Sequence, residues 1–220
     1  MIMKLPKIFQ PFKCPDLIRV GKSYDGGYLV NSLDILKTTH LISLGIGTDI
    51  SFEEQFHLIN PCDLDAYDGT VNVCDPFFQS HKRFHRSNVG DSGESLISII
   101  SKCSNPMFLK CDVDGAEYDF LNELIANSNM FSGMVIEFHN VHEYNNFNLL
   151  TNFIAKISPK LVHVHVNNNC YLDTDNGYIP IVLELTFTSS NNILWEPVEL
   201  PHKLDMPCHE QRPDFKIIFE

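Results

Sequence analysis

Acidic side chains and a histidine follow short apolar runs at several places in the chain, an arrangement typical of an active site built at strand ends. The segment LKCDVDGAEYDFL places Lys110, Asp112 and Asp114 where a buried strand is expected to meet a helix. Solvated charges seldom gather at such a point. Asp112, at the strand tip, is the stronger catalytic candidate, whereas Asp114 and Glu117 also suit helix capping.

The segment VIEFHNVH supplies the second catalytic group, because Glu137 and His139 lie on the same side of an expected strand. An unpaired carboxylate is costly to bury, so Glu137 needs a partner such as a histidine, a lysine or a metal. A histidine that titrates near neutral pH is a natural base for removing a hydroxyl proton. The alternative is a core histidine satisfied by backbone.

Two glycines end the apolar run THLISL and allow backbone to approach a ligand closely. A carboxylate at Asp49 could take the ammonium of a bound amino-acid group. The alternative is a turn needed only for chain reversal. The candidate ligand-binding residues here are Gly45, Gly47, Thr48 and Asp49.

An acidic residue follows the next expected strand about 20 residues later, the spacing at which a carboxylate meets ribose hydroxyls. We expect Tyr67 and Asp68 to bind a cofactor that carries a ribose, together with Asn88 from a later loop. Asp63 and Asp65 are competitors for this role, and an exposed loop acid is the alternative.

Polar residues that could read an acceptor occur near both ends of the chain. His163 and His165 alternate with valines, and the strand ends at an asparagine run in which Asn168 could bind sugar hydroxyls. An edge strand with a polar loop is the competing interpretation. With Asp25 and Tyr28, the residues His165 and Asn168 form the expected acceptor-binding set.

These residues are positioned by strands that alternate with helices, which predicts a doubly wound α/β fold with a mainly parallel sheet. Ser51 and Glu54 are expected to form a capping box. The expected strands are THLISL, CDLDAY, MFLKC, GMVIEF and KLVHVHV, and the expected helices cover 93–102, 116–127 and 146–157.

The last two strand-like runs, KLVHVHV and YIPIVLELTF, are joined by a polar loop too short for a crossover helix. They should therefore pair antiparallel, which distinguishes the seven-stranded methyltransferase fold from dinucleotide-binding dehydrogenases. We expect a single domain over 1–220. It divides into an extension with a short hairpin (1–35), a core (36–188) and an irregular tail (189–220).

Composition narrows the partners and the compartment. The formal charge of −12 disfavours nucleic acid and anionic membranes, because phosphate binding needs clustered lysine and arginine. The seven cysteines are scattered without a CxxC pair, which indicates reduced thiols. No apolar run reaches signal-peptide or membrane-spanning length. We expect a cytoplasmic monomer or homodimer that acts on a small molecule or glycan.

The ordered segments RVGKSYDGGYLV, SLGIGTDISFE, AYDGT, LKCDVDGAEYDFL, VIEFH and HVHVNNN resemble the FkbM-type methyltransferases of the class I superfamily, over about residues 17 to 187. The resemblance implies an S-adenosylmethionine-dependent O-methyltransferase that acts on sugars or other small hydroxyl compounds. It also implies specific roles: a donor pocket at Gly45, Gly47 and Asp49, a ribose contact from Asp68, Asp112 facing the methyl donor, and His139 as base oriented by Glu137.

Two departures from the family pattern stand out. Ser43 occupies a position where many class I enzymes carry an acid, and Asp114 is shorter than the more usual glutamate. Some related sugar methyltransferases hold a divalent metal at these tips, so Mg²⁺ or Mn²⁺ on Asp112, Asp114 and His139 is a less favoured alternative.

Two other functions fit part of the pattern. A nicotinamide-dependent oxidoreductase would share the glycine turn and the ribose acid, but its GxGxxG fingerprint is absent. A non-catalytic nucleotide-binding module of the same fold is the third reading. The acidic and histidine residues at the expected strand tips count against it.

Overall fold

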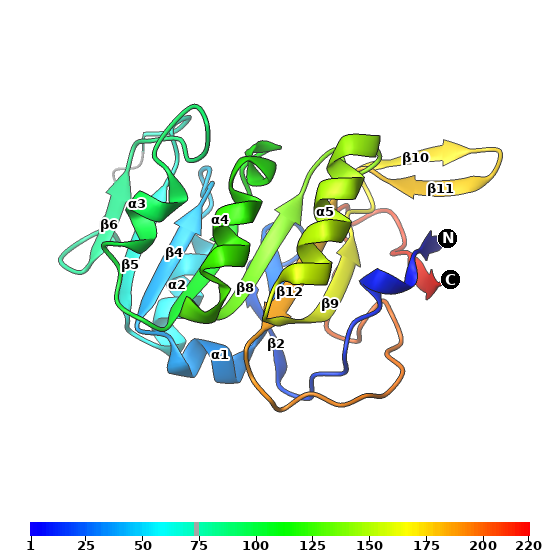
Figure 1. Ribbon diagram of the computed structural model, residues 1–220, viewed down its shortest axis with the longest axis horizontal. Coiled ribbons are helices and arrows are strands. Elements are labelled where there is room, and N and C mark those ends of the chain that lie inside the picture. The colour runs from blue at the N-terminus through cyan, green and yellow to red at the C-terminus, as the bar shows by residue number, and fades with distance from the viewer. Residues whose placement is uncertain (73–74) are drawn as a thin grey trace.

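The computed structural model describes residues 1–72 and 75–220. Its main feature is a seven-stranded sheet with the spatial order β6, β5, β4, β7, β8, β12, β9 (Figure 1). The strands are β4 (His40–Leu44), β5 (Asp63–Tyr67), β6 (Lys82–His85), β7 (Met107–Cys111), β8 (Phe131–Phe138), β9 (Lys160–Val166) and β12 (Leu183–Thr188).

The sheet is parallel from β6 to β8 and then reverses. Each neighbouring pair among β6, β5, β4, β7 and β8 is parallel, whereas β12 is antiparallel to both β8 and β9. The predicted doubly wound, seven-stranded methyltransferase-type fold is thereby confirmed. A dinucleotide-binding dehydrogenase sheet would continue in the parallel sense.

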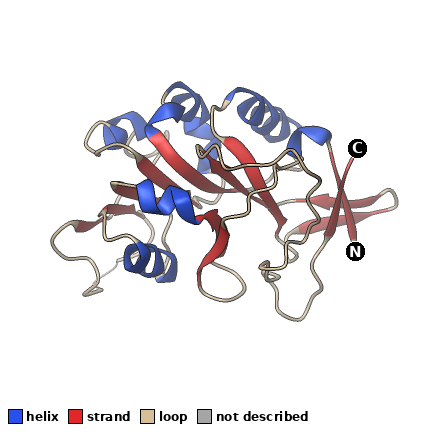
Figure 2. Cartoon of the chain, turned by 90° about the horizontal axis from the view of Figure 1, so that it is seen from below, coloured by secondary structure: helices blue, strands red, loops and turns tan. Residues whose placement is uncertain are grey.

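Helices cover both faces of the sheet (Figure 2). Alternate residues of each strand point to opposite faces, so Ile42 and Leu44 pack with the buried side chains of α3, α4 and α5. Leu41 on the opposite face packs with α1, α2 and a hairpin. The bounds are α1 (Ser32–Lys37), α2 (Ser51–Ile59), α3 (Leu96–Ile100), α4 (Leu121–Ala126), α5 (Tyr144–Lys156), and β2 (Leu17–Gly21) with β3 (Gly27–Asn31) for the hairpin.

The predicted helices exist, with shifted boundaries. The first is shortened to α3, the second begins as the 3₁₀ segment η2 (Ala116–Phe120) and continues as α4, and the third is α5. The predicted capping box at the start of α2 is wrong. The N-cap residue is Ile50, which makes no side-chain capping bond. Asp49 accepts from the backbone N–H of Ser51 at 3.1 Å, and the Ser51 hydroxyl accepts from the N–H of Lys22.

A second sheet joins the two ends of the chain, and the N- and C-termini lie together beside it in Figure 1. The predicted run YIPIVLELTF is divided, because the chain leaves the small sheet after Pro180 and enters the large one at Leu183. The tail expected to be irregular ends in a strand. The small sheet has the order β10 (Tyr171–Thr174), β11 (Gly177–Pro180), β1 (Ile2–Leu5), β13 (Lys216–Phe219).

The remaining elements are short. The 3₁₀ segment η1 (Lys7–Phe9) lies between β1 and β2, and η3 (Ser128–Met130) lies between α4 and β8. Within residues 1–72 and 75–220, no helix is both long and apolar enough to cross a membrane. The six cysteines in these ranges are free thiols, and the seventh, Cys74, lies outside the described residues.

Candidate functional site

A cavity of about 460 Å³ opens at the carboxyl ends of β4, β5 and β7, within the range of small-molecule sites. The carboxyl ends of parallel strands form one edge of a sheet, which is where ligands bind in this class of fold. The lining includes the predicted cofactor residues, which are Gly45, Gly47, Thr48, Asp49, Tyr67, Asp68, Asn88 and Asp112.

The two glycines after β4 do different things. A Cβ on Gly45 would lie 1.6 Å from the backbone oxygen of Asp112, so this glycine lets the tips of β4 and β7 meet. Gly47 also has a positive φ, of 54°, but an added Cβ there would meet nothing within 4 Å among the described residues. Gly47 therefore faces open space, as a ligand cradle requires.

Asp68 fixes the loops on either side of the cavity. One carboxylate oxygen accepts from the N–H of Gly47 at 2.8 Å, and the other accepts from the N–H and hydroxyl of Thr70 at 2.7 and 2.6 Å. Burial alone would raise the pKa of Asp68, but these bonds lower it. The carboxylate is thus held ionised and retains lone pairs for a ligand hydroxyl.

Glu53 on α2 is a cavity residue that the sequence analysis missed. It is 1% exposed and lines the cavity, where its Oε1 accepts from the hydroxyl of Ser43. Its Oε2 is buried with no hydrogen-bond partner among the described residues. Burial raises the pKa of Glu53. Ser43 occupies the position where many class I methyltransferases carry an acid, and in this protein Glu53 on the neighbouring helix places a carboxyl group beside it.

Asp49, the predicted acceptor of an ammonium group, already has a cationic partner. Its carboxylate lies 3.1 Å from the ammonium of Lys22 in the turn between β2 and β3. Lys110 supplies the buried cation of the cavity, where its ammonium donates to the backbone oxygen of Gly45 and lies 3.9 Å from Asp112. Glu53 is consequently better placed than Asp49 to receive a ligand cation.

The predicted catalytic residues meet beside this cavity. His139 Nε2 lies 3.8 Å from Asp112 Oδ1 and 3.9 Å from Glu137 Oε1. Tyr28, from the N-terminal hairpin, donates to Glu137 at 3.0 Å and lies 3.4 Å from Asp112. The buried Glu137 therefore has two partners, the expected His139 and also Tyr28.

The charges around His139 decide its protonation. Burial by itself would lower the pKa of His139, but the carboxylates of Glu117, Glu137 and Asp112 raise it to about 9. Burial, with the charges of Asp112 and Glu184, raises the pKa of Glu137 to about 8. At neutral pH the free protein thus holds His139 as an imidazolium, which must lose its proton before it can act as a base.

Glu117 holds two strand tips together. Its carboxylate accepts from the N–H of Gly115 at 2.9 Å and from the N–H of His139 at 2.6 Å, which agrees with the capping role considered from the sequence. Asp114 lies 3.7 Å from His139 Nε2, but its side chain is 97% exposed. The three residues named for a metal are close together, yet a cation there would compete with the proton on His139.

Two of the expected acceptor residues, His165 and Asn168, do not line the cavity. His165 lies buried between Glu184 and Asp214, at 3.1 Å from each. Asn168 is fully buried and bonds the backbone of His209 and Arg212. The tail folds back over both side chains, so their polar atoms hold the chain rather than face an acceptor. The other two, Asp25 and Tyr28, do line the cavity.

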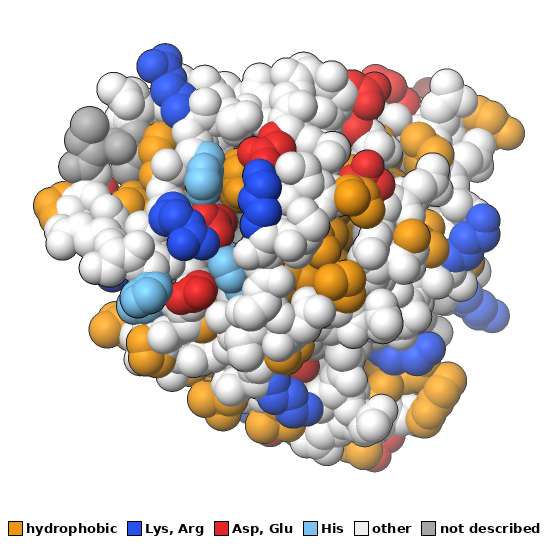
Figure 3. Space-filling view, turned by 60° about the vertical axis from the view of Figure 1, so that its left-hand side comes forward, with side chains coloured by type: hydrophobic (Ala, Val, Ile, Leu, Met, Phe, Trp, Pro, Cys, Tyr) orange, Lys and Arg blue, Asp and Glu red, His pale blue; other side chains and the backbone are white. Residues whose placement is uncertain are grey.

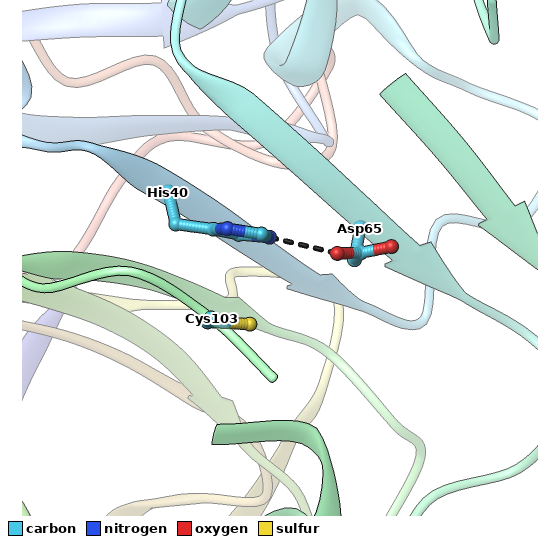
Figure 4. A group of neighbouring side chains, drawn as sticks. All are labelled: His40, Asp65 and Cys103. Carbon is cyan, nitrogen blue, oxygen red and sulfur yellow. Dashed lines mark hydrogen bonds and ion pairs between the residues drawn. The ribbon is translucent and has the colours of Figure 1, made fainter. Parts of the chain in front are cut away.

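The competitor acids Asp63 and Asp65 on β5 do not line the cavity, and Asp63 lies 3.4 Å from His81. Figure 4 shows His40 directed at Asp65, with Cys103 beside them. The bond from His40 is 2.8 Å, and Arg83 and His85 on β6 donate to the same carboxylate. The face of the molecule seen in Figure 3 carries acidic, basic and histidine side chains close together, so this edge is of mixed charge.

No protein-family model and no curated protein matches this sequence. Two solved structures are similar to it. A provisionally named RNA methyltransferase from Pyrococcus horikoshii has 10% identity over 71% of this chain and 77% of that chain, with a TM-score of 0.42. The precorrin-6y C5,15-methyltransferase from Geobacter metallireducens GS-15 has 11% identity over 72% of this chain and 85% of that chain, with a TM-score of 0.40.

Similarity at this level does not extend to substrate or mechanism, and the fold assignment rests on the strand order. The resemblance to FkbM-type proteins is not confirmed by these comparisons. One expectation is corrected by them. Nucleic acid is not excluded as a partner, contrary to the expectation from charge, since one of these structures is named as an RNA methyltransferase.

Proposed function

We propose that this protein is an S-adenosylmethionine-dependent methyltransferase whose donor site is the cavity at the ends of β4, β5 and β7. The observation that carries the proposal is the open cradle at Gly47, with the buried acids Glu53 and Asp68 on its two sides. Such a cavity suits a ligand with a cationic group at one end and vicinal hydroxyls at the other.

The donor set fits S-adenosylmethionine group by group. Asp68 is ionised and can accept from ribose hydroxyls. The unpartnered Oε2 of Glu53 suits the ammonium of the amino-acid end, and the Lys110 ammonium on the same wall suits its carboxylate. When bound, the cofactor supplies an electrophilic methyl group. The alternative dehydrogenase reading lacks both the GxGxxG loop and a wholly parallel sheet.

The residues beside the cavity would position the acceptor. We propose that the acceptor hydroxyl, on a sugar or another small molecule, binds near Asp112 and His139. His139 takes the hydroxyl proton after losing its own, and Glu137, held by Tyr28 at 3.0 Å, orients the imidazole. Positioning of the reacting groups supplies much of the acceleration in such a displacement.

Calorimetric titration with S-adenosylmethionine, S-adenosylhomocysteine and NAD tests the donor site. The variant Gly47→Ala should weaken binding of the first two, because the new Cβ enters the cradle. Gly177→Ala is the matched control, since Gly177 also has a positive φ and open space around it but lies in the β10–β11 hairpin. Binding of NAD alone, or an equal effect of both variants, would overturn the assignment.

Transfer of labelled methyl groups to a panel of sugars and small hydroxyl compounds tests the activity. His139→Ala should abolish turnover while cofactor binding stays normal, and EDTA should leave the rate unchanged. Retained turnover in this variant removes the base assignment. Loss of activity with EDTA that added Mg²⁺ or Mn²⁺ restores, and Zn²⁺ does not, would favour the metal alternative at Asp112, Asp114 and His139.

A further inference from the structure

A second polar cluster lies outside the cavity, where the tail folds over the edge of the large sheet. His165 on β9 and Glu184 on β12 are cross-strand neighbours, and His165 Nδ1 lies 3.1 Å from Glu184 Oε2. The thiol of Cys208, from the tail, lies 3.2 Å from Glu184 Oε1. One nitrogen, one oxygen and one sulfur ligand atom therefore lie within 4.8 Å of one another.

The surroundings of this trio are those of a metal site. His165 and Glu184 are 5% and 7% exposed, whereas Cys208 is partly exposed and leaves a path for entry. The second nitrogen of His165 lies 3.1 Å from Asp214. A carboxylate on the outer nitrogen is the usual partner of a metal-binding histidine, because it fixes the tautomer and the ring orientation.

The spacing suits zinc. Tetrahedral zinc takes thiolate, imidazole and carboxylate ligands at about 2.0–2.3 Å, which puts neighbouring ligand atoms roughly 3.3–3.6 Å apart. His165 Nδ1 lies 3.1 Å from Glu184 Oε2, and Cys208 Sγ lies 3.2 Å from Glu184 Oε1. One ligand atom from each of the three residues lies within 4.8 Å of the others, so side-chain rotation can bring them around one ion. Thiolate and imidazole together exclude Mg²⁺ and Ca²⁺, which prefer oxygen ligands.

Two comparable groups in the described residues are less suitable. The trio of His40, Asp65 and Cys103 in Figure 4 has similar chemistry, but the guanidinium of Arg83 already neutralises Asp65 at 2.5 Å. The trio beside the cavity contains no thiol, and its Asp114 is almost fully exposed. No arginine or lysine contacts the carboxylate of Glu184 among the hydrogen bonds and ion pairs of the described residues.

We propose that His165, Glu184 and Cys208 form a zinc site that fastens the tail to the sheet. Binding releases two protons to solvent, one from the Cys208 thiol and one from Nδ1 of His165, while Nε2–H stays directed at Asp214. Water fills the fourth position.

Cobalt titration of reduced, metal-free protein tests the proposal, because a thiolate ligand gives Co²⁺ a near-ultraviolet charge-transfer band. We expect one Co²⁺ per chain with this band, displaced by one Zn²⁺. Cys208→Ser should lose the band, and the matched control Cys103→Ser should keep it. Asp214→Asn should keep the band with about 10- to 100-fold weaker affinity, the usual effect of removing an outer partner.

A readout on the unmodified protein makes the test independent of variant folding. X-ray absorption of the zinc-loaded protein should show one sulfur at about 2.3 Å with lighter ligands at about 2.0–2.1 Å. A zinc shell without sulfur, a band that persists in Cys208→Ser, or the absence of stoichiometric binding would each overturn the proposal.

Discussion

The substitution Glu53→Gln isolates the residue that the structure adds to the proposed donor site. Glutamine has the same shape, and its amide oxygen can still accept from the hydroxyl of Ser43. The change therefore acts at Oε2, which is buried without a partner among the described residues. There a carboxylate oxygen is replaced by an NH₂ group that cannot accept a hydrogen bond from an ammonium.

The expected effect follows from the loss of one charge-assisted hydrogen bond, which contributes about 1.5–3 kcal/mol. This corresponds to a roughly 10- to 150-fold higher dissociation constant for S-adenosylmethionine. Methylthioadenosine lacks the amino-acid end, so its affinity should not change. Burial raises the pKa of Glu53, which means that the ionised group destabilises the free protein. Glu53→Gln should therefore melt at the same temperature as the wild type or higher.

Calorimetry with both ligands, together with thermal unfolding, measures these effects. Glu54→Gln is the control, because Glu54 is the next residue of α2 and is exposed. Equal loss of affinity for both ligands would mean that the variant damages the cavity as a whole. Unchanged affinity for S-adenosylmethionine would refute the assignment of Glu53 to the ammonium group.

Three further outcomes are expected. Because the pKa of His139 is raised to about 9, turnover should rise about tenfold per pH unit up to pH 9 and then level off; a plateau from pH 7 in a pH–rate profile would contradict its role as base. Asp68→Ala should weaken binding of S-adenosylmethionine by about 1–3 kcal/mol in calorimetry, and an unchanged dissociation constant would remove the ribose contact. Asp34 is 1% exposed, neither of its carboxylate oxygens has a hydrogen-bond partner in the described part of the chain, and burial raises its pKa from 3.8 to about 7. The folded state therefore binds more protons than the unfolded state between these values, and stability falls as the pH rises through this window. Asp34→Asn should remove up to about 4 kcal/mol of this penalty at pH 8 and little at pH 4, as denaturant unfolding at the two pH values would measure; an equal change at both would refute the argument.

Local patterns in the sequence were sufficient to predict which strand ends form the cavity. Apolar runs that end in glycine or acidic residues mark the strand tips, and parallel strands bring those tips to one edge. Residues as distant in the chain as Gly47, Asp68 and Asp112 could therefore be expected to line one cavity, and they do. The antiparallel strand followed from the short polar connection before it, because a parallel pair would have needed a crossover.

The tertiary structure decided what depends on contacts between distant elements. In the sequence, Glu53 is an ordinary residue of an amphipathic helix. Only the packing of α2 against the sheet places its side chain in the cavity lining. The imidazolium of His139 depends on carboxylates from separate segments of the chain. His165 lies near the end of β9 and Asn168 just beyond it, as the cavity residues do at their strands, but the returning tail buries both. Strand periodicity fixes the direction of a side chain, whereas its exposure and charge depend on which remote segment packs against it.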